Sequence, residues 1–253
     1  MDVVFGTSEV TQRFLKIVFL GTLPFIGFSV QAKDRISVGV GADMLDLISY
    51  QEGQLQGYLA PVYQCVFDKI EPEVKFVELP LKRGFHHLGR GELDALLPLA
   101  RSDHRDAVAV FAGELLTADY VFVSLRPLPP IELAEGLRYA IPRGFIGAQF
   151  IPNGNSVVTE VGSWSQLASM LKYDRIDAAV IPKLMVYDVF GAEGVNVYQQ
   201  LAGRLPVSLY LSEFSQSNGV ASEVLDAVEA CRIDNPVSLI TAEETSGGQE
   251  GDN

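Results

Sequence analysis

The sequence predicts an α/β fold in two lobes, on the basis of three observations. Apolar or alternating runs typical of strands take turns with stretches of helical periodicity, an order that implies sheets with parallel neighbours and right-handed crossovers. A proline cluster at 127–130 then breaks the chain, and a second, smaller set of strands and helices follows. Finally, a helix end, a turn and an Asp-Ala step into a buried strand occur once in each half, at 88–97 and at 171–180.

The first half is expected to alternate strands and helices from its start. Arg35 to Val40 alternates apolar and polar residues, as a strand does, and Gly53 and Gly57 flank a hairpin or loop over 52–58. The other expected elements are a helix over 60–70 that Pro72 ends, a strand over 74–79, a helix over 82–91 that Gly91 ends, a buried strand over 93–99 and a strand over 120–125.

The second half is expected to repeat this alternation on a smaller scale. Its elements are strands over 137–141 and 157–161, a helix over 164–172 and a strand over 178–181, followed by a segment over 184–190 to which no element is assigned. A strand over 207–211 and an amphipathic helix over 222–231 would return the chain to the first lobe. We therefore expect lobe one at residues 33–122 plus 207–240 and lobe two at residues 123–206.

The N-terminus has the three parts of a secretory signal. Arg13 and Lys16 precede an apolar run of 14 residues over 17–30, and Ala32 completes a small-residue cleavage site. Residues 1–32 are therefore expected to be a signal peptide, removed on export to the periplasm, with an uncleaved membrane anchor or a buried helix as the alternative. At the other end, residues 241–253 are acidic and glycine-rich and are expected to be a disordered tail.

Charge and cysteine content narrow the function. The net charge of −13 disfavours nucleic acid as a partner, because phosphate binding needs a basic face. Cys65 and Cys231 could form a disulfide in an oxidising compartment or stay two separate buried thiols, and the sequence leaves both open. Two distant cysteines and three histidines show no metal-ligand spacing, so neither a metal nor another cofactor is expected.

Several short segments occur in an order and spacing that are more specific than any one of them alone. They are ISVGV at 36–40, EGQLQGY at 52–58, residues 88–94 with the strand that follows, the Ser102 to Arg105 turn with Phe111 beyond it, and RIDAAVI at 175–181. Over this stretch the chain resembles the family 3 periplasmic solute-binding proteins, of the type II fold, which serve ABC importers for amino acids and similar solutes. The resemblance implies a two-lobed clamp, each lobe a mixed sheet flanked by helices.

The resemblance assigns a role to the turn over 102–105. In that family the turn carries an arginine that grips a ligand carboxylate, and the matching residue is Arg105. A guanidinium suits this role because its rigid fork of donors fits a carboxylate with two hydrogen bonds. The alternative is a solvated arginine paired with Asp103 or Asp106. Arg101, just before this turn, is expected to flank a helix or to be a surface charge.

The other residues with which this family usually binds an amino acid are largely missing from the sequence. Met44 stands where an aromatic residue is usual, and Pro98 and Ala100 stand where hydroxyl residues precede the arginine turn. The Arg143-Gly144-Phe145 segment lacks the hydroxyl of the usual Gly-Ser/Thr step.

The family's acceptor for an α-amino group is missing too. Pro182-Lys183 replaces the usual carboxylate, so an ammonium ligand would meet a like charge. We therefore expect an acid without an amino group, held by Arg105 and Lys183 between apolar walls that include Phe150. The expected ligand-binding residues are Arg105, Lys183, Met44, Asp46, Phe145, Gly144 and Ala100, with Asp43 and Tyr50 as further candidates.

Three functions are compatible with this resemblance. The first is a monomeric binding protein that captures a small polar or carboxylate-bearing solute between its lobes and docks on an inner-membrane permease. The second is a periplasmic sensor of the same fold that signals to a membrane receptor. The third is an enzyme similar to the cyclic-acid dehydratases of this fold, but neither Glu114 nor Lys183 is marked by spacing as a proton-transfer residue. We expect the first, and no enzymatic activity.

Overall fold

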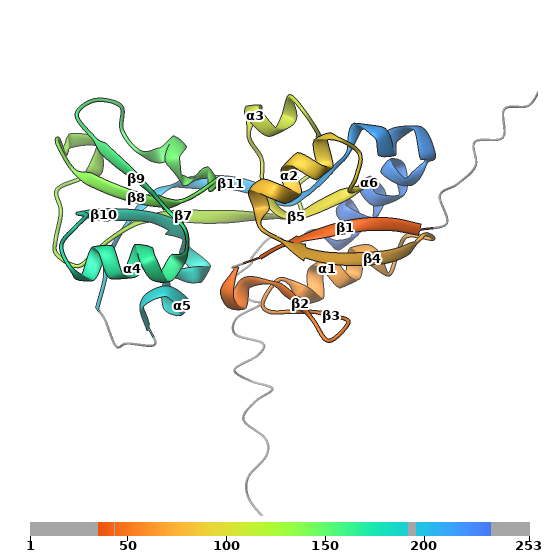
Figure 1. Ribbon diagram of the computed structural model, residues 1–253, viewed down its shortest axis with the longest axis horizontal. Coiled ribbons are helices and arrows are strands. Elements are labelled where there is room, and N and C mark those ends of the chain that lie inside the picture. Colours follow the sequence, from red (N-terminus) through yellow and green to blue (C-terminus); the bar gives the residue numbers. More distant parts are fainter. Residues whose placement is uncertain (1–34, 43, 192–195, 234–253) are drawn as a thin grey trace, which may run out of the picture.

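The computed structural model describes residues 35–42, 44–191 and 196–233. The signal peptide expected over 1–32 and the tail expected over 241–253 lie outside the described residues. The described chain forms two α/β halves side by side, joined by two strands that run from one half into the other (Figure 1). No helix within these ranges is both long and apolar enough to cross a membrane.

The first half is built on three parallel strands. β1 (Arg35–Gly41) lies between β4 (Glu73–Leu79) and β5 (Ala95–Ala100). The connections contain the hairpin of β2 (Ser49–Gln51) and β3 (Gln54–Gln56), then α1 (Ala60–Phe67) and α2 (Leu81–Gly89). Every residue of β5 is buried, which accounts for its continuous apolar sequence. The elements expected here are confirmed, with ends shifted by a few residues.

The second half repeats the arrangement around another parallel set. β8 (Arg138–Pro142) lies between β9 (Val157–Val161) and β10 (Ala178–Pro182). The helices are α4 (Trp164–Lys172), whose N-cap is Ser163, and α5 (Val186–Phe190). Two 3-10 turns, η3 (Ile146–Phe150) and η4 (Lys183–Met185), follow β8 and β10. Both turns therefore lie at the carboxyl ends of parallel strands, where ligands of α/β folds bind.

Two antiparallel strands connect the halves. β7 (Leu116–Ser124) pairs with β11 (Tyr198–Leu211) along most of its length. Residues 207–211 of β11 also pair with β5, and residues 120–123 of β7 pair with β10. The strands thus form one mixed sheet in the order β4-β1-β5-β11-β7-β10-β8-β9, with the short β6 (Val110–Phe111) also on β11. The sequence predicted only 207–211 of β11, which begins nine residues earlier.

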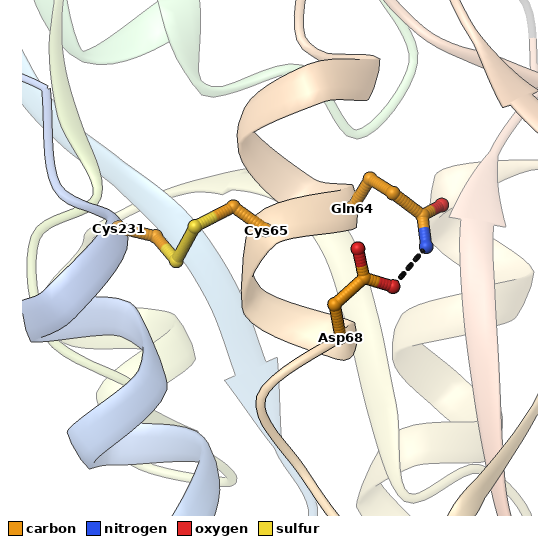
Figure 2. The surroundings of a disulfide bond; sticks show 4 residues. All are labelled: Gln64, Cys65, Asp68 and Cys231. Atoms are coloured by element: carbon orange, nitrogen blue, oxygen red, sulfur yellow. Dashed lines mark hydrogen bonds between the residues drawn. A yellow bond between two sulfur atoms is a disulfide. The ribbon is translucent and has the colours of Figure 1, made fainter.

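The chain closes on the first half through α6 (Val220–Cys231), which follows η6 (Glu213–Asn218). α6 packs on α1, and a disulfide joins Cys231 of α6 to Cys65 of α1, with Cα atoms 5.9 Å apart (Figure 2). Of the two states that the sequence left open, the structure therefore contains the disulfide. It links residues 166 positions apart and ties the end of the described chain to its first helix.

Candidate ligand-binding site

A single short turn positions Arg105. The turn is α3 (Asp103–Asp106), and Ser102 caps its start by accepting a hydrogen bond from the main-chain N–H of Arg105. Tyr210 of β11 anchors both ends, because its hydroxyl accepts from the N–H of Ser102 at 3.2 Å and donates to Oδ1 of Asp106 at 2.6 Å. The arginine therefore stands on a turn held by a buried tyrosine of the joining strand.

The side chain of Arg105 points into the protein. Arg105 is 8% exposed, and its Nη1 donates to the carbonyl oxygen of Ala100 at 2.6 Å. Burial lowers the pKa of its guanidinium, and no carboxylate among the described residues forms an ion pair with it. Asp106 instead accepts from Arg101 Nε at 2.9 Å. The alternative of a solvated Arg105 paired with Asp103 or Asp106 is therefore wrong, whereas Arg101 is the expected surface charge.

Arg105 lines a cavity between the two halves, which we call the central cavity. Its walls come from η1 (Leu45–Leu47) and its flanks and from α2, β5, β7, η3, η4 and β11, and apart from Arg105 and Tyr120 the lining residues are apolar. Its volume is about 50 Å³, room for a few waters. A single buried cation thus faces a small apolar space.

Tyr120 adds a polar atom beside the arginine. Burial raises the pKa of its hydroxyl, and the charge of Arg105 acts on it in the opposite direction. Its ring packs against Phe145 and Phe150, with centroids 5.9 and 5.3 Å away. No hydrogen bond joins its hydroxyl to another described residue, and its raised pKa keeps it protonated at the edge of the cavity that Tyr120 lines.

Two further cavities adjoin the central one. The outer cavity, of about 300 Å³, lies between α2, the chain after β8 and the start of α4, and shares Met44, Leu81 and Phe145 with the central cavity. The side cavity, of about 690 Å³, lies along α3 and η3 and shares Arg105, Phe145 and Ile146. Phe145 therefore stands where all three meet.

The structure brings together most of the residues that the sequence predicted for the site. Met44, Ala100, Arg105 and Phe145 line the central cavity, and Gly144 lines the side cavity.

The remaining predicted residues lie elsewhere. Lys183 and Asp46 are exposed and line none of these three cavities, because Pro182 and Leu184 face the central cavity on either side of Lys183. Asp43 lies outside the described residues, and Tyr50 packs on Phe76 in the first half. Phe150 supports Tyr120 instead of lining the cavity.

Several lining residues were missed by sequence reasoning. Tyr120, Leu81, Ile146 and Leu184 all line the central cavity, yet each belongs to a segment that looks like ordinary core in the sequence. The one available signal was Tyr120, since a tyrosine within a buried strand needs a partner for its hydroxyl.

A carboxylate from the second half contacts the first half near this site. The carboxylate of Asp188 on α5 interacts with the main-chain N–H of Asp46 on η1, while Oδ2 of Asp188 is buried with no hydrogen-bond partner among the described residues. Burial, and then the charge of Asp46, raises the pKa of Asp188 to about 6. The contact between the halves is therefore sensitive to the charge of one residue.

Comparison with known proteins identifies the fold. No family model and no curated protein matches the sequence. An ancestral arginine-binding protein bound to arginine matches with a TM-score of 0.67 and 16% identity, over 87% of this chain and 100% of that one.

Two other solved structures are similar to a comparable degree. A substrate-binding protein of an ABC uptake transporter from Streptococcus pneumoniae with bound histidine gives a TM-score of 0.65 and 17% identity, over 78% and 86% of the two chains. A histidine kinase sensor domain with similarity to periplasmic binding proteins gives 0.66 and 14%, over 87% and 97%. The chain therefore has the two-lobed α/β fold of the periplasmic solute-binding proteins.

Proposed function

We propose that this protein is a solute-binding protein of family 3 that captures a carboxylate-bearing solute between its two halves. The observation that carries the proposal is Arg105, a buried guanidinium at the wall of an apolar cavity with no ion-pair partner among the described residues. Burying a charge without a counter-ion is costly, so the arrangement is favourable when an anion completes it.

The chemistry of the central cavity selects a carboxylate. One guanidinium N–H is taken by the carbonyl of Ala100, which holds the plane in place and leaves other donors for a bidentate contact. The hydroxyl of Tyr120 supplies a further donor. Both groups act in a space with little water, where charge-assisted hydrogen bonds are stronger than in solution.

The same lining argues against an α-amino acid. Among the described residues, no carboxylate lines the central cavity, so an ammonium group would be buried without a counter-ion. The arginine-bound and histidine-bound relatives hold amino acids. The described lining of this chain includes an arginine but no acceptor for an amino group. We therefore infer that the ligand is an acid without an amino group.

As a role, we propose delivery of the solute to an inner-membrane permease by a monomer in the periplasm, after removal of residues 1–32. The proposal includes a first lobe at residues 33–122 plus 207–240 and a second lobe at residues 123–206. The two lobes would close on each other by movement about β7 and β11. The similarity to a histidine kinase sensor domain supports a second candidate, a module that reports the solute to a membrane receptor. Both candidates are binding proteins, not enzymes.

Thermal denaturation tests the proposal. The unfolding midpoint is measured against a panel of organic acids, their methyl esters, amino acids and polyamines. A ligand at one hundred times its dissociation constant adds about 2.7 kcal/mol of stability, which shifts the midpoint visibly. We expect a shift with an acid but not with its ester, lost in Arg105→Ala and kept in the control Arg83→Ala, an exposed arginine on α2. A shift that survives in Arg105→Ala would falsify the proposal.

A further inference from the structure

The outer cavity has a charge pattern unlike that of the chain as a whole. It is bounded by Lys82 of α2 in the first half and by Arg143, between β8 and η3, in the second half. None of the described residues in its lining is acidic, although the chain has 32 acidic against 19 basic residues. A positively lined pocket on an acidic protein is a local reversal of sign, and it attracts anions.

The two cations are available to a ligand. Both are exposed at the cavity, and neither forms an ion pair within the described part of the chain. They come from opposite halves at a point of close approach, since a Cβ placed on Gly144 would lie 3.5 Å from Cβ of Lys82. An anion between them would therefore bridge the two halves.

The start of α4 adds to the positive potential. Ser163, the N-cap of this helix of nine residues, and Trp164 both line the outer cavity. A helix N-terminus carries a partial positive charge, which falls off within one turn. The helix dipole and the two side chains thus act in the same direction.

Apolar side chains lie between this pocket and the cavity that Arg105 lines. Met44, Leu81 and Phe145 line both the outer and the central cavity, so the two spaces share a hydrophobic wall. We propose that the solute is a dicarboxylate with an apolar spacer: one carboxylate lies on Arg105, the spacer lies along the shared wall, and the second carboxylate lies between Lys82 and Arg143. This inference rests on the proposed function, because it takes Arg105 as the first contact.

The arrangement would also select the closed form. The first carboxylate contacts the first half, while the second contacts both, so a dicarboxylate is held most tightly when the halves are together. A monocarboxylate leaves the two outer cations solvated. We therefore expect the dicarboxylate to bind at least about tenfold more tightly than its monomethyl ester, a difference of about 1.4 kcal/mol.

The test is calorimetric titration with linear α,ω-dicarboxylates of increasing chain length, each paired with its monomethyl ester. The site variant is Lys82→Met with Arg143→Met. Its matched control is Lys75→Met with Arg175→Met, which removes one exposed cation from each half, away from the three cavities. We expect one chain length to give the largest preference over its ester, and that preference to vanish in the site variant and persist in the control.

Other results would contradict the inference, the proposed function or both. Equal binding of every diacid and its ester, a preference that survives in the site variant, or one lost equally in the control would each overturn the inference. Monoesters that bind through Arg105 with no preference for diacids would leave the proposed function standing. Diacid binding that is insensitive to Arg105→Ala, or no binding of any acid, would overturn both.

Discussion

Arg105 on α3 and Arg101, four residues earlier and just before α3, have opposite surroundings. Arg101 is exposed, pairs with Asp106 and lies over the ring of Phe111, 5.4 Å from its centroid. Arg105 is buried and donates to a main-chain carbonyl. The difference arises because Asp106 is already committed to Arg101 and Tyr210, which leaves Arg105 without an internal counter-ion. An acidic residue close to Arg105 in the sequence therefore did not indicate an ion pair with it.

Tyr210→Phe tests whether the turn must be held for Arg105 to bind. The change removes a hydroxyl that donates to Asp106 and accepts from the N–H of Ser102. We expect a loss of about 1–2 kcal/mol in the free energy of unfolding and weaker binding of acids, although Arg105 is unchanged. Denaturant unfolding and calorimetric titration measure the two effects. Tyr173→Phe, at an exposed tyrosine, is the control, and unaltered affinity in Tyr210→Phe would show that the turn is held by other contacts.

Asp188 predicts how stability depends on pH. Its pKa is raised to about 6 in the folded protein from 3.8, so ionised Asp188 destabilises the fold above about pH 6, and this cost disappears as the pH falls toward 3.8. Asp188→Asn should therefore raise the free energy of unfolding by about 1–2 kcal/mol at pH 7.5, allowing for partial exposure, with little gain at pH 4. Thermal unfolding of both proteins across this range is the measurement. A gain of the same size at both pH values would contradict the assignment.

At the scale of elements, the pattern that occurs in both halves has one structural explanation. Asp94 accepts a hydrogen bond from the main-chain N–H of Ser37 on β1, and Asp177 accepts one from that of Arg138 on β8. Each aspartate also donates its own N–H to the carbonyl of the same partner residue. In each half, therefore, the carboxylate of an aspartate just before one strand is hydrogen-bonded to the parallel strand beside it: Asp94, before β5, to β1, and Asp177, before β10, to β8.

Asp177→Asn tests the importance of this tie. Hydrogen bonds from Arg138, foremost, and from Arg126 lower the pKa of Asp177 to about 2, against the effect of burial. Its stabilising contribution is therefore complete above the unfolded value of 3.8 and is lost as the pH falls toward 2. We expect Asp177→Asn to cost about 2 kcal/mol at pH 7 and much less near pH 2.5. Urea unfolding at the two pH values measures this, and an unchanged midpoint at pH 7 would contradict it.

Periodicity predicted most of the strands and helices, and its one large error is instructive. The first part of β11, with Gln199, Gln200 and Arg204, shows no apolar alternation and is half exposed, yet it forms a strand because it pairs along β7. Its residues are held by a long-range ladder, which a local pattern cannot reveal. Residues 207–211 of the same strand are buried and were predicted.

At the scale of the molecule, the site depends on which elements meet across the two halves. Leu81, Tyr120 and Leu184 belong to three distant elements, and none carries a local mark of binding. The place of Arg105 beside the cavity could be predicted because the turn that carries it resembles a known pattern. The lining could not, because it results from the packing of β7 and β11 between the halves. The error on Lys183 has the same origin: position along the chain did not determine which side chains of 182–184 face the cavity.

The disulfide between Cys65 and Cys231 affects the stability of the whole chain. It closes a loop of 166 residues between the first and the last described helix, and in the chain-entropy model such a link limits the unfolded ensemble by about 5 kcal/mol. We expect Cys65→Ser with Cys231→Ser to lose about 3–5 kcal/mol in the free energy of unfolding but to keep its affinity for acids, because neither cysteine lines the central cavity. Denaturant unfolding and titration, beside wild-type protein treated with a reductant, measure both. Reduced wild type should match the double variant in stability. A loss of affinity with stability unchanged would instead mean that the α1–α6 contact shapes the binding site.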